Sequence, residues 1–211
     1  MFIDSHAHIT SEQFNTDRDD IIQRAIDAGV HFIVNPGTDL EDSKRVIELA
    51  EKYPNIYACV GFHPHDAKKA DDESLQEIEE LSKHPKVVAI GEIGLDFHYD
   101  FSPRDVQAHV FKSQIEIAQR RNLPIVIHTR ESNEETIGIV EKAVAAAPDW
   151  RSQKATPHSR YPAPKGVFHC FSGDAAMAWK VINMGFYVSM PGVVTFKNAG
   201  SAGEVAARVS S

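Results

Sequence analysis

Short apolar runs alternate along the chain with longer segments whose apolar residues recur at helical spacing. Helical spacing is clearest at 18–29, 40–53, 73–84 and 106–122, and Asp174 is expected to begin a further helix. Strands that alternate with helices through short links indicate βαβ units with parallel pairing. We therefore expect a parallel sheet of seven strands, and the apolar runs place them at residues 2–4, 31–37, 56–63, 86–97, 123–128, 166–173 and 185–192.

The strand count separates two parallel architectures. A doubly wound sheet that binds a dinucleotide would carry a GxGxxG turn after its first strand, and this chain has none there. Seven strand–helix units instead favour an α/β, TIM-type (β/α)8 barrel that is truncated after the seventh strand. The 211 residues suit one barrel domain over 1–211. Without an eighth unit, the first and seventh strands would be left as hydrogen-bonding edges.

One segment, from about 147 to 165, departs from this alternation. It contains four prolines and mostly basic charges, among them Arg151, Lys154, Arg160 and Lys165. A basic loop suggests a contact with nucleic acid, but this loop leads from a helix to the next strand. Such loops lie on the barrel face opposite the active site. We therefore interpret the segment as an irregular surface insertion.

Composition limits the classes of function. The chain has 22 Lys and Arg against 30 Asp and Glu, a net charge of −8, which disfavours a broad electrostatic grip on nucleic acid. This net charge is still compatible with a phosphate-ester substrate that binds at one small cationic centre. Two distant cysteines, Cys59 and Cys170, are expected to be buried thiols in a reducing compartment. With no leader and no apolar run of membrane length, we expect a cytoplasmic protein without a membrane partner.

Side chains that can bind metals stand at the ends of several apolar runs. Asp4, His6 and His8 would share one face if the first strand continued through them. Active sites of parallel barrels form at the carboxyl ends of the strands, so residues there should meet. Imidazole and carboxylate groups together suit divalent metals. The candidate ligands are His6 and His8 after the first run, Glu92 in the fourth, His128 at the end of the fifth and His169 in the sixth.

With these residues in place, the sequence resembles the TatD family of metal-dependent deoxyribonucleases, which are amidohydrolase-like TIM barrels. The resemblance runs from Met1 to about Gly192. It implies hydrolysis of DNA phosphodiester bonds by two divalent ions (Mg, Mn or Zn), which activate water and neutralise charge on the phosphate. The matching stretches are FIDSHAH (2–8), GFHPH (61–65), GEIGLDF (91–97), LPIVIHTRE (123–131) and FHCFSG (168–173).

The resemblance also implies the ligand set. His6 and His8 would hold one metal, Glu92 would bridge two, and His128 with His169 would hold the second. His63 would contact the substrate phosphate or aid proton transfer, which makes Glu92 and His63 the catalytic candidates.

Three more residues lie just beyond strand ends. Asp96 could orient a ligand histidine, and Arg130 could clamp a substrate phosphate with its bidentate fork. Alternatively, both pair with neighbouring charges on the rim. His65 follows Pro64, which interrupts a strand, so we expect a structural role for it.

The chain departs from the family at one place. Similar proteins continue into an eighth strand with a Thr-Asp motif, whose Asp completes the first metal site and can act as general base. This chain ends TFKNAGSAGEVAARVSS and contains no such motif. We therefore expect one intact metal site, formed by Glu92, His128 and His169, and reduced or absent hydrolase activity.

Two alternatives to a DNA nuclease stay open. The first is a related barrel hydrolase that cleaves an amide, a lactone or a small phosphoester. Many of these bridge their metals with a modified lysine of the fourth strand, whereas here Lys86 lies at the wrong end of that strand. The second is a metal-binding pseudoenzyme. The oligomeric state is left undetermined by the sequence.

Overall fold

The computed structural model describes residues 2–153 and 162–209. In these residues seven strands form one parallel sheet, and each strand pairs with the strand that follows it in sequence. The expected seven-stranded parallel sheet is confirmed. The strands are β1 (Phe2–Asp4), β2 (Val30–Pro36), β3 (Ile56–Val60), β4 (Val87–Asp96), β5 (Ile125–Arg130), β6 (Gly166–Phe168) and β7 (Phe186–Val188).

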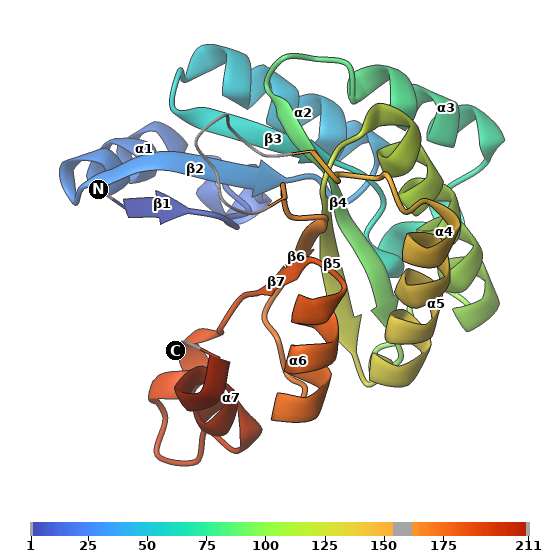
Figure 1. Ribbon diagram of the computed structural model, residues 1–211. Helices are drawn as coiled ribbons and strands as arrows, with labels where there is room; N and C mark the ends of the chain where they lie inside the picture. Colours follow the sequence, from blue (N-terminus) through green and yellow to red (C-terminus); the bar gives the residue numbers. More distant parts are fainter. Residues whose placement is uncertain (1, 154–161, 210–211) are drawn as a thin grey trace.

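Helices connect the strands and cover the outside of the curled sheet, so the expected α/β, TIM-type architecture is confirmed (Figure 1). Helix α2 packs on β3, α4 on β4, α5 on β5 and α6 on β7. In the described part of the chain, each helix is too short or too polar to cross a bilayer. The helices are α1 (Arg18–Asp27), α2 (Leu40–Lys52), α3 (Asp72–Leu81), α4 (Arg104–Arg121), α5 (Asn133–Ala146), α6 (Ala175–Asn183) and α7 (Ser201–Val209), with 3-10 turns η1 (Glu12–Phe14), η2 (Pro64–Lys69) and η3 (Gly192–Thr195).

Short polar side chains set where several helices begin. The Asp39 carboxylate accepts the backbone N–H of Asp42 at the start of α2, and Asp71 caps α3 in a reciprocal capping box. Asp174 accepts the N–H of Met177, which confirms that a helix begins there. At the other end of α4, Asn122 adopts φ +52, the left-handed conformation that ends many helices.

The core lies between the central strands and the helices. Strand β4 is buried over almost its whole length, as expected of a parallel strand covered on both faces. Around it, large side chains such as Phe111, Phe168 and Phe186 are almost completely buried. The stable centre of the sheet therefore coincides with the strands that carry Glu92 and His128.

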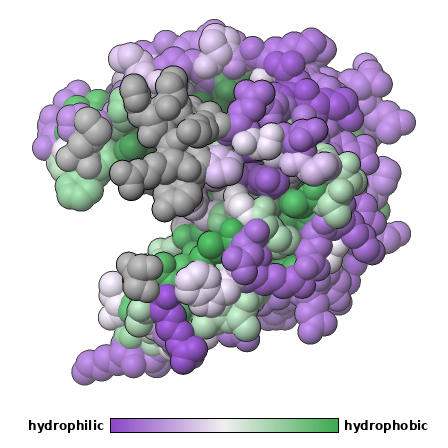
Figure 2. Space-filling view, in the orientation of Figure 1, coloured by the Kyte–Doolittle hydropathy of each residue, from purple (hydrophilic) through white to green (hydrophobic). Residues whose placement is uncertain are grey.

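The two outer strands are exposed. Phe2 and Ile3 of β1 are 69% and 61% exposed, and Tyr187 of β7 is 64% exposed. The expectation that the first and seventh strands form edges is confirmed, and β1 ends at Asp4, so it does not continue through His6 and His8. Figure 2 shows apolar side chains gathered near α6 and α7, around a hollow that opens toward the N-terminal strands.

Only the ends of the proline-rich segment belong to the described residues; Lys154 and Arg160 lie outside them. Trp150 is buried, and its indole N–H donates to the Leu123 carbonyl at 2.9 Å. The Arg151 guanidinium donates to the carbonyl of Pro164 at 2.9 Å. These contacts hold both ends at the amino-terminal ends of β5 and β6, away from the strand ends that carry the candidate ligands.

Gly94 allows β4 and β5 to approach closely beside the candidate site. Its φ is +145°, and an added Cβ would overlap the backbone carbonyl oxygen of His128. We expect Gly94→Ala to lower the free energy of unfolding by about 1–3 kcal/mol, measured by chemical denaturation. Gly138→Ala is the matched control, because a Cβ at Gly138 of α5 meets open space. Equal stability of the two variants would refute this explanation.

Candidate metal centre

Five polar side chains converge where the strands end. His6 and His8 follow β1, His63 follows β3, Glu92 lies in β4 and His128 lies in β5. Among the described residues they form two groups, His6–His8–Glu92 and His63–Glu92–His128. Within each group the potential ligand atoms all lie within 4.8 Å of one another. Glu92 belongs to both groups.

The Glu92 carboxylate divides its two oxygens between the groups. Oε2 lies 3.2 Å from His6 Nε2 and 3.3 Å from His8 Nε2. Oε1 lies 3.1 Å from His128 Nδ1 and 3.9 Å from His63 Nε2. Burial acts to raise the pKa of Glu92, but hydrogen bonds from His128, His6 and His8 outweigh burial and hold its pKa well below the usual range. The carboxylate is therefore a buried anion that faces histidines on two sides.

The first group fits a metal ion. The Nε2 atoms of His6 and His8 lie 3.1 Å apart, and both face the same Glu92 oxygen. The buried Nδ1 atom of His6 has no hydrogen-bond partner among the described residues, which is uncommon for a buried polar atom. Two imidazoles and one carboxylate are the donor set that divalent transition metals prefer. A cation would satisfy the nitrogen lone pairs and balance the charge of Glu92.

In the second group, Asp96 holds His128. Asp96 is completely buried, and its Oδ2 lies 3.0 Å from His128 Nε2 and 2.9 Å from His65 Nε2. Burial acts to raise the pKa of Asp96, but the backbone N–H of Tyr99 and the two histidines lower it to about 2. With a proton on Nε2 shared with this anion, His128 would bind a cation beside Glu92 through Nδ1, once the cation displaces the Nδ1 proton. Asp96 is thus placed to orient the His128 ring, and His65 contacts the same carboxylate oxygen.

His63 and His169 also lie beside these ligand groups, with different neighbours. His63 joins Glu92 and His128, whereas the ring of His169 stacks on His6 with centroids 3.4 Å apart. Burial lowers the pKa of His63 to about 3 and, with His6 nearby, that of His169 to about 4. Both imidazoles are therefore neutral near pH 7 and keep a nitrogen lone pair.

Other candidate residues lie outside these two groups. Arg130 is exposed, with its guanidinium 4.7 Å from the centre of the Tyr99 ring. Asp4 is exposed and accepts the backbone N–H of His6, because β1 ends at Asp4 and the alternation does not continue to His8. Cys59 is buried as expected, but Cys170 is exposed, so the expectation of a buried thiol is wrong there.

Three buried amides hold the loops of the site, and sequence reasoning missed them. Asn35 accepts the backbone N–H groups of Ile9 and Thr10 at 2.6 and 3.2 Å, just after His8. Gln114 bonds both backbone groups of Phe62, and Gln107 bonds both backbone groups of Asp96. The two glutamines share the buried face of α4 with apolar residues. Polar residues at the apolar positions of a helix were the signal available in the sequence.

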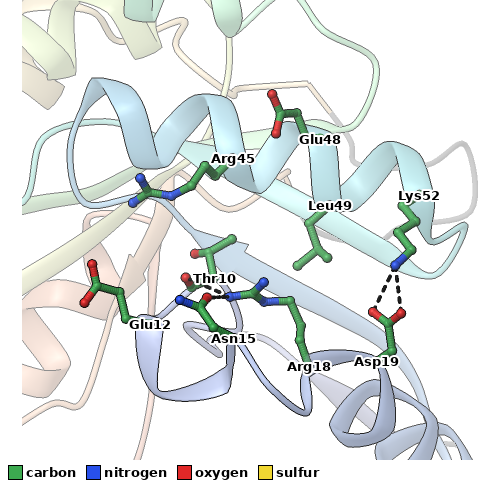
Figure 3. Close-up of a pocket in the computed structure, with 9 residues that line it drawn as sticks. All are labelled: Thr10, Glu12, Asn15, Arg18, Asp19, Arg45, Glu48, Leu49 and Lys52. Carbon is green, nitrogen blue, oxygen red and sulfur yellow. Dashed lines mark hydrogen bonds and ion pairs between the residues drawn. The ribbon is translucent and has the colours of Figure 1, made fainter.

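A polar pocket of about 380 Å³ lies elsewhere, between η1, the start of α1 and α2 (Figure 3). Its basic side chains already have partners, and Arg45 pairs with Asp42 at 3.0 Å. Lys52 pairs with Asp19 at 2.8 Å, and the Arg18 guanidinium donates to the Ile9 carbonyl and to the Asn15 side chain. These contacts hold the loop after His8 against α2, so we assign the pocket a structural role.

Comparison with known proteins agrees with the architecture and shows the family. Residues 3–211 match the family described as TatD related DNase. The chain belongs to the TatD family. It is 43% identical over 205 residues to the uncharacterized metal-dependent hydrolase YabD of Bacillus subtilis, covering 97% of this chain and 74% of YabD. As a TatD-family member, it is a metal-dependent hydrolase whose His and Glu groups can bind metal.

Two further TatD relatives come from Escherichia coli K12. The protein named 3'-5' ssDNA/RNA exonuclease TatD is 33% identical over 197 residues, which cover 93% of this chain and 70% of that protein. The crystal structure of the TatD homolog YjjV superimposes with a TM-score of 0.84 at 32% identity, covering 98% of this chain and 74% of YjjV. The fold and the family therefore agree with what the motifs implied.

Proposed function

We propose that this chain hydrolyses phosphodiester bonds of DNA, with single-stranded DNA as the first substrate to test. The main support is the Glu92 carboxylate, which presents one oxygen to His6 and His8 and the other to His128. This arrangement suits two divalent ions that share one bridging ligand. A relative named as a single-stranded DNA and RNA exonuclease supports the choice of substrate.

His6, His8 and Glu92 would hold one ion, and Glu92 with His128 would hold the second. His169 is proposed as a further ligand of the second ion, because it follows β6 directly at the same end of the sheet. Bound divalent ions supply an activated water and neutralise charge on the phosphate.

The remaining residues orient a metal ligand or bind the substrate. Asp96 fixes the proton of His128 on Nε2. His63 Nδ1 accepts the backbone N–H of His65 at 3.2 Å, which places the His63 proton on Nε2, on the side of Glu92. We propose that this N–H donates to a phosphate oxygen of the substrate, and that Arg130 at the rim binds a neighbouring phosphate.

His128→Ala tests the proposal. After metal stripping and reloading with Mg²⁺ or Mn²⁺, the wild-type chain should shorten single-stranded DNA in a gel assay. His128→Ala should slow this at least about 100-fold, because replacing even the partner of a metal ligand costs up to that factor. His109→Ala is the matched control, since His109 is an exposed histidine of α4. It should cleave at the wild-type rate.

The same assay separates the alternatives. Turnover of small esters or amides without cleavage of DNA would show a different barrel hydrolase. Metal binding by calorimetry without any turnover would show a pseudoenzyme. Equal cleavage by wild type and His128→Ala would overturn the assigned site.

A further inference from the structure

Two aromatic side chains stand exposed beside the candidate metal centre. Tyr99 and Phe101 follow β4 and are 47% and 54% exposed. Their rings stack at a centroid distance of 5.2 Å with an interplanar angle of 17°. Neighbouring positions on this rim are polar, for example Asp100 and Arg104. A stacked aromatic pair on a polar rim exposes more apolar surface than packing of the fold requires.

A cation continues the stack. The Arg130 guanidinium lies over the Tyr99 ring, 4.7 Å from its centre, while Phe101 stacks on the same ring. About half of the Phe101 side chain is exposed, so part of its ring is open to a ligand. Within residues 2–153 and 162–209 the guanidinium of Arg130 makes no ion pair, so its charge is available to an anion.

The loop that carries the pair is held in place. Asp96 Oδ1 accepts the backbone N–H of Tyr99 at 2.9 Å, and the Lys68 ammonium donates to the Phe101 carbonyl at 2.9 Å. The Ser102 hydroxyl donates to the His65 carbonyl at 2.8 Å. A loop fixed in this way loses little conformational entropy when a ligand binds.

The His65 ring lies between the Tyr99–Phe101 pair and Asp96, which holds the metal-ligand candidate His128. The His65 ring makes T-shaped contacts with the rings of Tyr99 and Phe101, at centroid distances of 5.4 and 4.9 Å. His65 and His128 both contact Asp96. A ligand stacked on Phe101 would thus lie beside a phosphate held at the metal groups.

We propose that Tyr99 and Phe101 form a base-stacking platform that, with Arg130, binds one nucleotide of single-stranded nucleic acid next to the phosphate that is cleaved. The proposal rests on the proposed function, which it deepens by naming a subsite. Aromatic rings bind bases of any sequence by stacking, and Arg adds charge for the backbone. A stack with one cation suits a chain of net charge −8.

The test measures binding apart from catalysis. A short fluorescein-labelled oligothymidylate is titrated with the full chain in the presence of chelator, and binding is followed by anisotropy. Phe101→Ala should weaken binding about five- to 150-fold, the loss expected for one stacked base. Phe101→Trp should retain the affinity. Tyr187→Ala, which removes an exposed ring from the β7 edge, is the control and should bind as the wild type.

An oligonucleotide with abasic sites tests whether the bases themselves are bound. The wild type should bind it more weakly than the base-bearing strand, whereas Phe101→Ala should bind both alike. Equal affinity of wild type and Phe101→Ala, or no binding by the wild type under chelation, would overturn the platform. Cleavage that needs His128 but not Phe101 would leave the proposed function standing without the platform. Phe101-dependent binding without cleavage would support the platform and contradict the proposed function.

Discussion

Glu92→Gln is expected to abolish metal-dependent hydrolysis, with a loss of about 10³-fold or more, because bound metals supply several kcal/mol of transition-state stabilisation. Glu92 supplies the negative charge common to both histidine groups. A glutamine keeps the shape but removes the charge, and its NH₂ group would face one set of imidazole nitrogens. Both groups should therefore lose metal affinity together.

Thermal unfolding with and without added Mn²⁺ measures this directly. Metal that binds only the folded chain raises the melting temperature, so the wild type should shift and Glu92→Gln should not. Glu116→Gln, the same change at an exposed position of α4, should shift as the wild type does. If Glu92→Gln kept the metal-induced shift and cleaved DNA at an undiminished rate, the shared-carboxylate arrangement would be wrong.

Asn35→Ala should lower the free energy of unfolding by about 2–5 kcal/mol, since each buried group left unpaired costs about 1–3 kcal/mol. Asn35 is fully buried at the end of β2, and its amide oxygen is the acceptor for both Ile9 N–H and Thr10 N–H. Alanine leaves both donors without a partner. The loop that follows His8 would then lose its anchor to the sheet.

Urea denaturation gives the stability change, and calorimetric titration with Mn²⁺ shows whether metal binding by His6 and His8 weakens with it. Asn15→Ala is a suitable control, because the Asn15 side chain is exposed and accepts a hydrogen bond from the Arg18 side chain. Exposed polar contacts of this kind contribute less than about 1 kcal/mol. Similar denaturation midpoints for the two variants would show that Asn35 does not hold the loop.

Strand order and the convergence of distant residues were predictable because they depend on periodic patterns. Glu92 within the fourth apolar run and His128 at the end of the fifth belong to neighbouring strands of a parallel sheet, so they are expected to meet. The family resemblance then indicated two ligand groups around one glutamate, and the structure brings His6, His8 and His128 around Glu92. These features follow from topology, which the alternation of strands and helices already determines.

Other features depend on contacts that leave no periodic trace. The exposure of β1 depends on which strands flank it, and the pattern of residues 2–4 alone does not show this. Whether His63 or His169 approaches Glu92 depends on the paths of two loops. Tyr99 and Phe101 lie in a loop, where hydrophobicity does not reveal that two rings stack on each other.

The edge position of β1 affects the local stability of the segment that carries His6 and His8. His6 and His8 follow β1, which is three residues long. Among the described residues, β1 pairs with β2 and forms an edge of the sheet. Glu92 and His128 belong to β4 and β5, which have neighbours on both sides. Fraying begins at the periphery of a fold. We therefore expect hydrogen exchange to be faster around His6 and His8 than around Glu92 and His128.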